Sequence, residues 1–117
     1  MTFLRRFAIS LLLSGVIAAP ARADFQCDVR VYHILMYNDG TVSVAHSGRG
    51  TFTHICNLNT VRGGINPTTC AMWTATLHSI KARNGLAMFA YPGTGTCASL
   101  ATFEVAPVPT MVGNMNQ

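Results

Sequence analysis

The chain has 117 residues with eight basic and four acidic side chains, which give a formal net charge of +4. This length holds one small domain with a single core. The basic balance does not indicate nucleic acid or an anionic membrane as partner. Three of the eight basic residues, Arg5, Arg6 and Arg22, lie in the first 23 residues, and the other five against four acidic residues leave only +1.

Residues 1–23 have the pattern of a secretory signal peptide. A basic start at Arg5 and Arg6 is followed by an apolar run over 7–19 and a small-residue cleavage site ending at Ala23. The alternative, an uncleaved membrane anchor, needs about 20 apolar residues, more than this run offers. We therefore expect a secreted or periplasmic bacterial protein with no membrane span after cleavage, a domain over 24–106 and an extended tail over 107–117.

Four cysteines lie after the predicted cleavage site: Cys27, Cys56, Cys70 and Cys97. An even number in an exported chain predicts disulfides, for which three pairings exist. We favour Cys56–Cys70, which closes a loop of modest length beside a helix, and Cys27–Cys97, which ties the amino end to the carboxyl-terminal strand region. A zinc site is the competing interpretation, and the absence of a Cys-x-x-Cys pair counts against it.

The first predicted strand covers 29–37 and a hairpin turn at Asn38-Asp39-Gly40 leads into a second over 41–45. The register stays open. A two-residue loop places His33 opposite His46, whereas a three-residue loop with Gly40 as a bulge places Tyr32 there. Two opposed histidines suggest a metal, but no third ligand has a fitting spacing, so we predict no metal site.

A third strand is predicted over 51–56, followed by a polar loop over 57–66. This loop contains Arg62-Gly63-Gly64. No Gly-Lys-Ser/Thr follows the glycines, so the sequence does not predict nucleotide binding.

The helix has clear signals at both ends. Asn66 is a good N-cap and Pro67 suits the first helical position, while Asn84-Gly85 predicts a left-handed end. Between them an apolar stripe recurs at helical spacing: Cys70, Trp73, Leu77 and Ile80. Strands are predicted over 86–91 and 97–105, and Pro107 and Pro109 limit the tail to a sheet edge or an extended arm.

Five sequential strands with a helix between the third and the fourth match the layout of an OB-fold, a small five-stranded antiparallel barrel. We expect this mostly β fold, held by two disulfides. An open antiparallel sheet with one helix on its face is the other architecture that fits the pattern.

The stretch 51–91 resembles the B subunits of bacterial A–B toxins of the subtilase cytotoxin and typhoid toxin type. The similarity rests on Thr53-His54-Ile55-Cys56, Cys70, Trp73, Leu77, the strand ending at Tyr91 and the start Asp24-Phe25. It implies an OB-fold, a ring of five subunits, a catalytic partner subunit and binding of host-cell glycans, often sialylated.

The resemblance also implies a site residue. Tyr91 falls where this family has a tyrosine in its sugar site, and an aromatic ring packs well on sugar C–H groups. The family's serine and acidic sugar contacts have no match, because Cys27-Asp28-Val29 occupies that region.

The sequence does not predict an enzyme or a cofactor. It has no Gly-x-Ser-x-Gly motif, and disulfides leave no free thiol nucleophile. Two functions remain. The first is a glycan-binding module of the toxin B-subunit kind, and the second is a small exported protein-interaction domain of the same fold.

Overall fold

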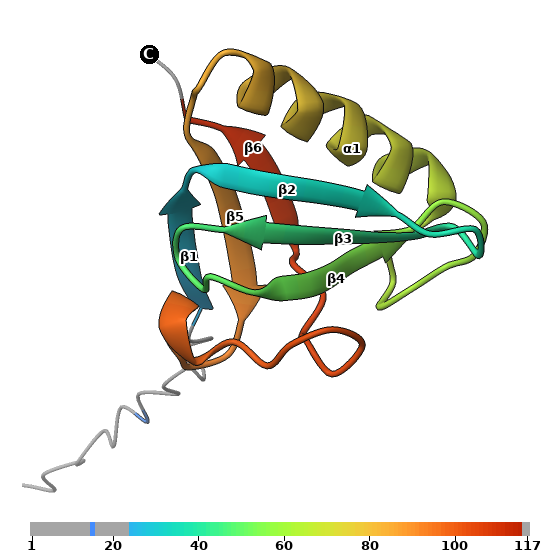
Figure 1. Ribbon diagram of the computed structural model, residues 1–117. Coiled ribbons are helices and arrows are strands. Elements are labelled where there is room, and N and C mark those ends of the chain that lie inside the picture. The colour runs from blue at the N-terminus through green and yellow to red at the C-terminus, as the bar shows by residue number, and fades with distance from the viewer. Residues whose placement is uncertain (1–14, 16–23, 116–117) are drawn as a thin grey trace, which may run out of the picture.

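The computed structural model describes residue 15 and residues 24–115 (Figure 1). The signal peptide predicted over residues 1–23 therefore lies outside the described residues, except for Gly15. Within the described part of the chain, no helix is long and apolar enough to cross a membrane.

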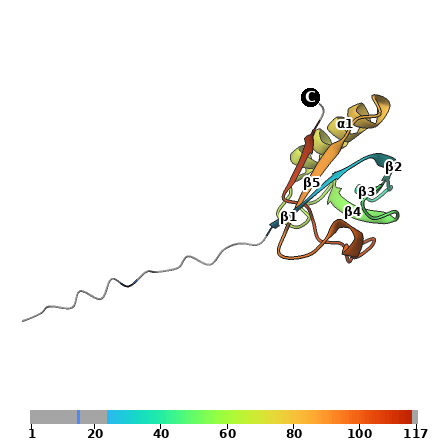
Figure 2. The ribbon, with the colours of Figure 1, turned by 90° about the vertical axis from the view of Figure 1, so that its left-hand side faces the viewer.

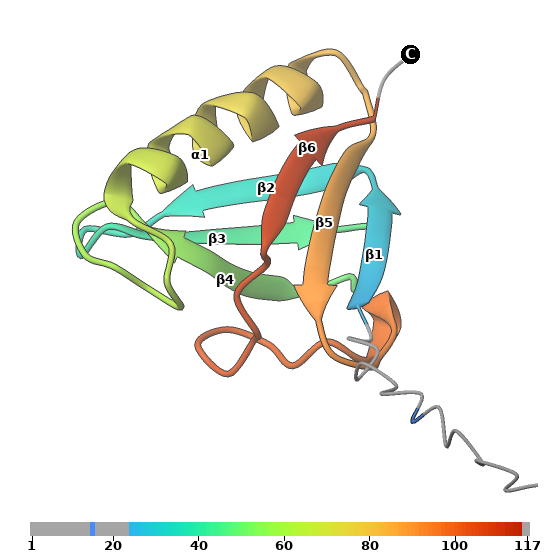
Figure 3. The same cartoon turned by 180° about the vertical axis from the view of Figure 1, so that it is seen from behind.

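The described residues form six strands in two three-stranded antiparallel sheets. The first sheet has the order β1-β5-β6, with β1 at Asp24–Val29, β5 at Ala87–Pro92 and β6 at Met111–Asn114. The second has the order β2-β3-β4, with β2 at Val31–Met36, β3 at Thr41–His46 and β4 at Phe52–Asn57. Figure 3 shows the strands of the first sheet running across those of the second. The mostly β fold with one helix is confirmed, and the meander of β2, β3 and β4 is as predicted.

The single five-stranded barrel was a wrong prediction, because the two sheets do not join into a closed one. In the described residues, β4 meets the carboxyl-terminal part of the chain through one isolated parallel bridge, between Thr53 and Phe103. A closed barrel needs a continuous ladder at every edge. The segment expected to supply it, 97–105, is mostly irregular.

The strand predicted over 29–37 corresponds to β2, and an additional strand that was not predicted, β1, precedes it in the other sheet, with Arg30 at the corner between them. The Arg30 backbone N–H donates to the Ser47 hydroxyl at 3.0 Å, and its carbonyl accepts from the Ser47 N–H at 2.9 Å. Its guanidinium donates to the Asn84 carbonyl at 2.5 Å. These bonds satisfy the backbone of the corner residue, so the chain passes from one sheet to the other in a single step.

Two registers were left open for the hairpin between β2 and β3. The structure has the one with a three-residue loop. The Tyr37 N–H donates to the Thr41 carbonyl at 2.8 Å, and Gly40 takes a left-handed φ of 90°. A further irregularity between Val31 and His33 shifts the register, so Val31 rather than Tyr32 lies opposite His46. His33 lies opposite Ala45, and the two histidines do not face each other.

Helix α1 spans Pro67–Ala82 and has the predicted ends. The Asn66 side chain accepts from the Thr69 N–H at 2.8 Å, and Asn84 adopts a left-handed φ of 56° while the Gly85 N–H donates to the Ile80 carbonyl. The buried face consists of Cys70, Thr74, Leu77 and Ile80. Trp73, predicted to belong to this face, is only partly buried at its border.

The strand predicted over 97–105 is absent. A short 3-10 helix, η1 (Cys97–Ser99), begins there, because Thr96 and Ser99 cap each other's backbone N–H groups. An irregular segment follows, and the chain becomes a strand again only in β6, which pairs with β5 from Ala90↔Met111 to Ala87↔Asn114. Within the tail predicted over 107–117, residues 111–114 thus form the edge strand of the first sheet.

The core lies between the two sheets and beneath the helix, which contacts β2, β4 and β6. Its largest apolar members come from both sheets and from α1: Val42, Val44, Ile55, Phe89, Tyr91, Leu77 and Ile80. The helix and η1 lie at opposite ends of this arrangement (Figure 2). The surface around η1 is therefore formed without residues of α1.

Candidate functional site

Tyr91, the sugar-site residue that the toxin resemblance implies, lies in the core. Its side chain is 0% exposed and stacks on Phe25, with ring centroids 5.3 Å apart and planes inclined by 20°. Burial raises the pKa of Tyr91 to about 12, an effect that the Thr53 hydroxyl opposes in part. The Thr53 hydroxyl lies near the Tyr91 hydroxyl, but no partner lies in hydrogen-bonding geometry. Because the residue is fully buried, neither the ring nor the hydroxyl offers surface to a ligand in this conformation.

The turn at 93–95 completes the cover over Tyr91. Gly95 lies against the Phe25 ring so closely that an added Cβ would come within 3.2 Å of the Phe25 Cε1 atom. Phe25 thus lies against both Gly95 and Tyr91, and a sugar could stack on the tyrosine face that Phe25 covers only after Phe25 had moved. The ligand role of Tyr91 stays a prediction.

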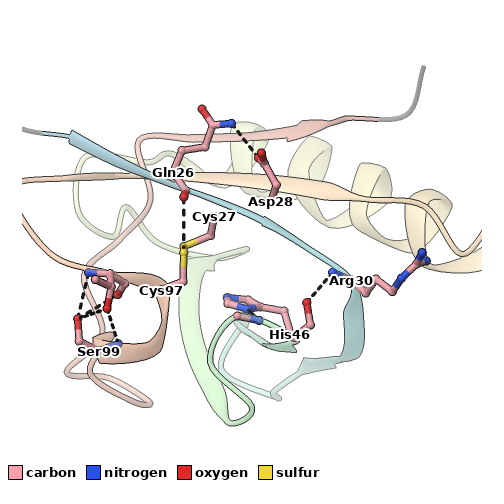
Figure 4. The surroundings of a disulfide bond; sticks show 10 residues. Gln26, Cys27, Asp28, Arg30, His46, Cys97 and Ser99 are labelled. Carbon is pink, nitrogen blue, oxygen red and sulfur yellow. Dashed lines mark hydrogen bonds between the residues drawn. A yellow bond between two sulfur atoms is a disulfide. The ribbon is translucent and has the colours of Figure 1, made fainter.

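Both favoured disulfides are confirmed. Cys56–Cys70 joins β4 to α1 and Cys27–Cys97 joins β1 to η1, with sequence separations of 14 and 70 residues. Figure 4 shows the second bond, where the Cys97 Sγ atom lies 3.5 Å from the Gln26 carbonyl oxygen. A disulfide sulfur has no proton to donate, so this is a close contact only. The bond fixes the start of the irregular segment 100–106 against the first sheet.

No group of three or more His, Cys, Asp or Glu side chains in the described residues could hold a metal ion. His33 is exposed on β2, whereas His46 is 0% exposed beneath the sheet and stacks on Phe89. The two histidines that could have formed a metal pair thus lie in different environments.

A second group of side chains, which the sequence did not indicate, includes His54 of β4, two rings that contact it and three charged groups that shift its pKa. It combines two aromatic rings, two acids and one cation from three other segments, and we call it the His54 cluster: Tyr37, Asp39, His54, Arg62, Phe103 and Glu104. Because β4 sits at an edge of its sheet, turns and loops from both sides can converge on this residue.

Two rings of the cluster contact the imidazole and are themselves open to solvent. The ring centroids of Tyr37 and His54 are 5.7 Å apart, and Phe103 meets His54 edge-on at 6.0 Å. Tyr37 and Phe103 are each 43% exposed. The half-buried imidazole forms the floor, and its Nε2 atom is buried without a hydrogen-bond partner.

The charged groups of the cluster act on His54 in opposite directions. Burial lowers the pKa of His54, the nearby Arg62 guanidinium lowers it further, and Glu104 and Asp39 oppose both. The pKa of Asp39 is itself lowered, chiefly because its carboxylate accepts from the Thr41 N–H at 2.9 Å. The Asp39 carboxylate is therefore ionised at neutral pH.

Hydrogen bonds tie the segment at 103–104 to β4 and to Arg62. The Phe103 N–H donates to the Phe52 carbonyl at 2.9 Å and the His54 N–H to the Phe103 carbonyl at 3.2 Å. The Arg62 Nη2 group donates to the Glu104 carbonyl at 3.0 Å. Phe103 adopts a left-handed φ of 53°, an unfavourable conformation for a residue with a Cβ. Such conformations persist where surrounding contacts impose them and are frequent at ligand sites.

No protein family, no curated protein and no solved structure matches the chain.

Proposed function

We propose that this protein is an exported, disulfide-bonded, non-catalytic binding module whose ligand is a glycan bound at the His54 cluster. The observation that carries the proposal is the pair of exposed rings, Tyr37 and Phe103, that both contact His54. Aromatic faces pack on the C–H groups of a sugar, while neighbouring polar groups bond its hydroxyls. Asp39, Glu104 and the Tyr37 hydroxyl supply those polar groups here.

Export is supported by the two disulfides, because such bonds persist in oxidising compartments. It is also supported by the signal-peptide pattern of residues 1–23. The expected location is the periplasm or the extracellular medium.

The resemblance to toxin B subunits extends the proposal to a homo-oligomeric ring that carries a catalytic partner subunit. It does not supply the sugar contact, since Tyr91 is covered by Phe25. Native mass spectrometry of residues 24–117 tests the ring directly. A monomer at micromolar concentration would remove ring formation from the proposal and leave glycan binding standing.

A protein-interaction role is the second candidate, and one observation favours it. β2 lies at an edge of its sheet and exposes Tyr32, Leu35 and Met36, each more than 40% accessible. Exposed apolar side chains on an edge strand are typical of surfaces that receive another protein. This surface lies along β2, whereas the sugar is placed around His54 on β4.

A glycan array probed with residues 24–117 tests the proposal. Tyr37→Ala should weaken binding by about tenfold or more, because one such ring contact contributes roughly 1.4 kcal/mol. Tyr32→Ala is the matched control, since Tyr32 is similarly exposed but contacts none of the described cluster rings. Equal loss for both variants, or no glycan bound by the folded wild type, contradicts glycan binding at this place.

A further inference from the structure

The two disulfides differ in how far solvent can reach them. Cys56 and Cys70 are both 0% exposed, because their bond lies between β4 and the buried face of α1. Cys27 is 1% exposed, whereas Cys97 is partly exposed at the start of η1 (Figure 4). Thiol–disulfide exchange requires a thiolate to reach one of the two sulfur atoms, so access decides which bond reacts in a folded protein. Of the two bonds, Cys27–Cys97 is the one with a cysteine open to solvent.

The segment that this disulfide holds has few other polar ties. We call residues 93–101 the strap. In the described part of the chain, the hydrogen bonds made before Leu100 stay inside the strap, chiefly between Thr96 and Ser99. The next tie to the rest of the protein is the Arg49 Nε atom, which donates to the Leu100 carbonyl at 2.6 Å. The disulfide is therefore the anchor of the strap's first half.

Close packing shows what the strap covers. A Cβ added at Gly95 would lie 3.2 Å from the Phe25 Cε1 atom, and one added at Gly48 would lie 3.1 Å from the Cys97 Cβ atom. The strap thus lies against the start of β1 and against the turn that follows β3. Such van der Waals contacts are individually weak, so they depend on the cross-link that holds the two surfaces together.

We infer that Cys27–Cys97 is a redox-sensitive latch: a dithiol reduces it in the folded protein, and the strap then leaves the first sheet while Cys56–Cys70 and the core stay intact. The latch is closed in oxidising compartments, where disulfides persist. It is separate from glycan binding, because backbone bonds to β4 keep Phe103 in the His54 cluster when the strap is open.

The exposed sulfur sets the order of the exchange. A thiolate of the dithiol attacks the Cys97 Sγ atom, the S–S bond breaks, and Cys27 leaves as a thiolate that takes up a proton. The remaining thiol of the reagent then attacks the reagent's own sulfur in the mixed disulfide, and Cys97 leaves in the same way. Both cysteines end as thiols and the dithiol ends as a cyclic disulfide, so the electrons and protons gained by the protein come from the reagent.

Graded treatment of the purified, oxidised protein with dithiothreitol, followed by alkylation and peptide mass spectrometry, tests the latch. Initially, Cys27 and Cys97 should be alkylated at least about a hundredfold faster than Cys56 and Cys70. The slower pair becomes accessible only in unfolded molecules, on the order of one in a thousand or fewer.

Hydrogen exchange on the same samples tests the strap. Once Cys27–Cys97 alone is reduced, exchange should accelerate over residues 93–101. Fluorescence of Trp73, which packs against the core from α1, should not change, because the helix keeps its own disulfide.

Two double variants serve as matched controls. Cys27→Ser with Cys97→Ser should show fast exchange over 93–101 without reductant, and dithiothreitol should change it no further. In Cys56→Ser with Cys70→Ser, dithiothreitol should still open the strap. Reduction of Cys56–Cys70 first, or of both bonds at one rate, in the wild type overturns the inference. Selective reduction of Cys27–Cys97 with unchanged exchange over 93–101 overturns it as well.

Discussion

His46 stacks on Phe89 in the core, with the ring centroids 5.2 Å apart and the ring planes inclined by 29°. Its Nδ1 atom accepts from the Gly48 N–H at 3.1 Å, which places the proton of the neutral ring on Nε2. That Nε2 atom is buried and has no partner. Burial disfavours a charged imidazole here and lowers the pKa of His46 from 6.5 to about 4, and a hydrogen bond with its own backbone opposes this only in part.

This histidine should make the fold sensitive to acid. The unfolded chain binds a proton near pH 6.5 and the folded chain only near pH 4, so unfolding is favoured by protonation between these values. The free energy of unfolding should fall by about 1.4 kcal/mol per pH unit over that window, roughly 3 kcal/mol in all. Urea unfolding of residues 24–117 at pH 7.5, 6, 5 and 4 measures it.

Two variants separate His46 from the other titrating groups. His46→Asn keeps an acceptor for the Gly48 N–H but does not titrate. The slope between pH 6.5 and 4 should therefore fall to the part that His54, whose pKa is also lowered, contributes, even if the variant is less stable. His78→Asn changes an exposed histidine on α1 and should retain the wild-type slope. A steep slope that persists in His46→Asn would show that the acid sensitivity has another origin.

Local signals explain what the sequence could predict. The ends of α1 were predictable because Asn66, Pro67 and Asn84 act on their own backbone neighbours. The disulfide pairing was predictable because Cys56 and Cys70 flank one loop, which leaves only one partner for Cys27.

Long-range partners explain what could not be predicted. The corner at Arg30 depends on Ser47 and Asn84, and nothing in the apolar run around it marks a break. The predicted strand over 97–105 fails at its start for a local reason, the reciprocal capping of Thr96 and Ser99, which is only a weak pattern in sequence. The His54 cluster depends on long-range partners again, since its members come together only when the fold is in place.

The hydroxyl of Tyr91 should contribute nothing to stability. It is buried without a hydrogen-bond partner, so Tyr91→Phe removes a desolvation penalty and should leave stability unchanged or raise it by up to about 1 kcal/mol. Tyr91→Ala removes the ring that stacks on Phe25 and should cost about 3–5 kcal/mol. Thermal and urea unfolding measure both. A loss above about 2 kcal/mol for Tyr91→Phe would reveal a polar partner for the hydroxyl.

The two disulfides should differ in what they stabilise. Replacing Cys56 and Cys70 by alanine opens a short loop and should cost about 3 kcal/mol, whereas replacing Cys27 and Cys97 opens a long one and should cost about 4 kcal/mol. Only the second change frees η1, so hydrogen exchange should accelerate in 97–106 beyond the global effect. Uniform acceleration in both variants would mean that the other contacts of this segment hold it without the disulfide, among them the Arg49 bond to the Leu100 carbonyl and the backbone bonds of Phe103 to β4.

Gly40 and Gly50 provide a matched pair for separating backbone strain from steric clash. Both have a left-handed φ, 90° at Gly40 and 77° at Gly50, so alanine is strained at either by about 1 kcal/mol. At Gly40 an added Cβ would lie 2.7 Å from the Asn57 Oδ1 atom and 2.8 Å from the Asn59 Cγ atom, whereas at Gly50 it meets nothing within 4 Å. Gly40→Ala must therefore also displace Asn57, which bonds the Asn59 and Thr60 N–H groups and the Asp39 carbonyl.

We expect Gly50→Ala to lower the free energy of unfolding by about 1 kcal/mol and Gly40→Ala by roughly 2–4 kcal/mol, the excess reflecting the clash and the lost bonds. Because Asn57 anchors Asp39, Gly40→Ala should also weaken ligand binding at the His54 cluster at temperatures where the variant is still folded. Gly50→Ala should leave binding unchanged. Equal destabilisation by the two changes would mean that the loop at 57–60 yields without cost, and that the position of Asp39 does not depend on it.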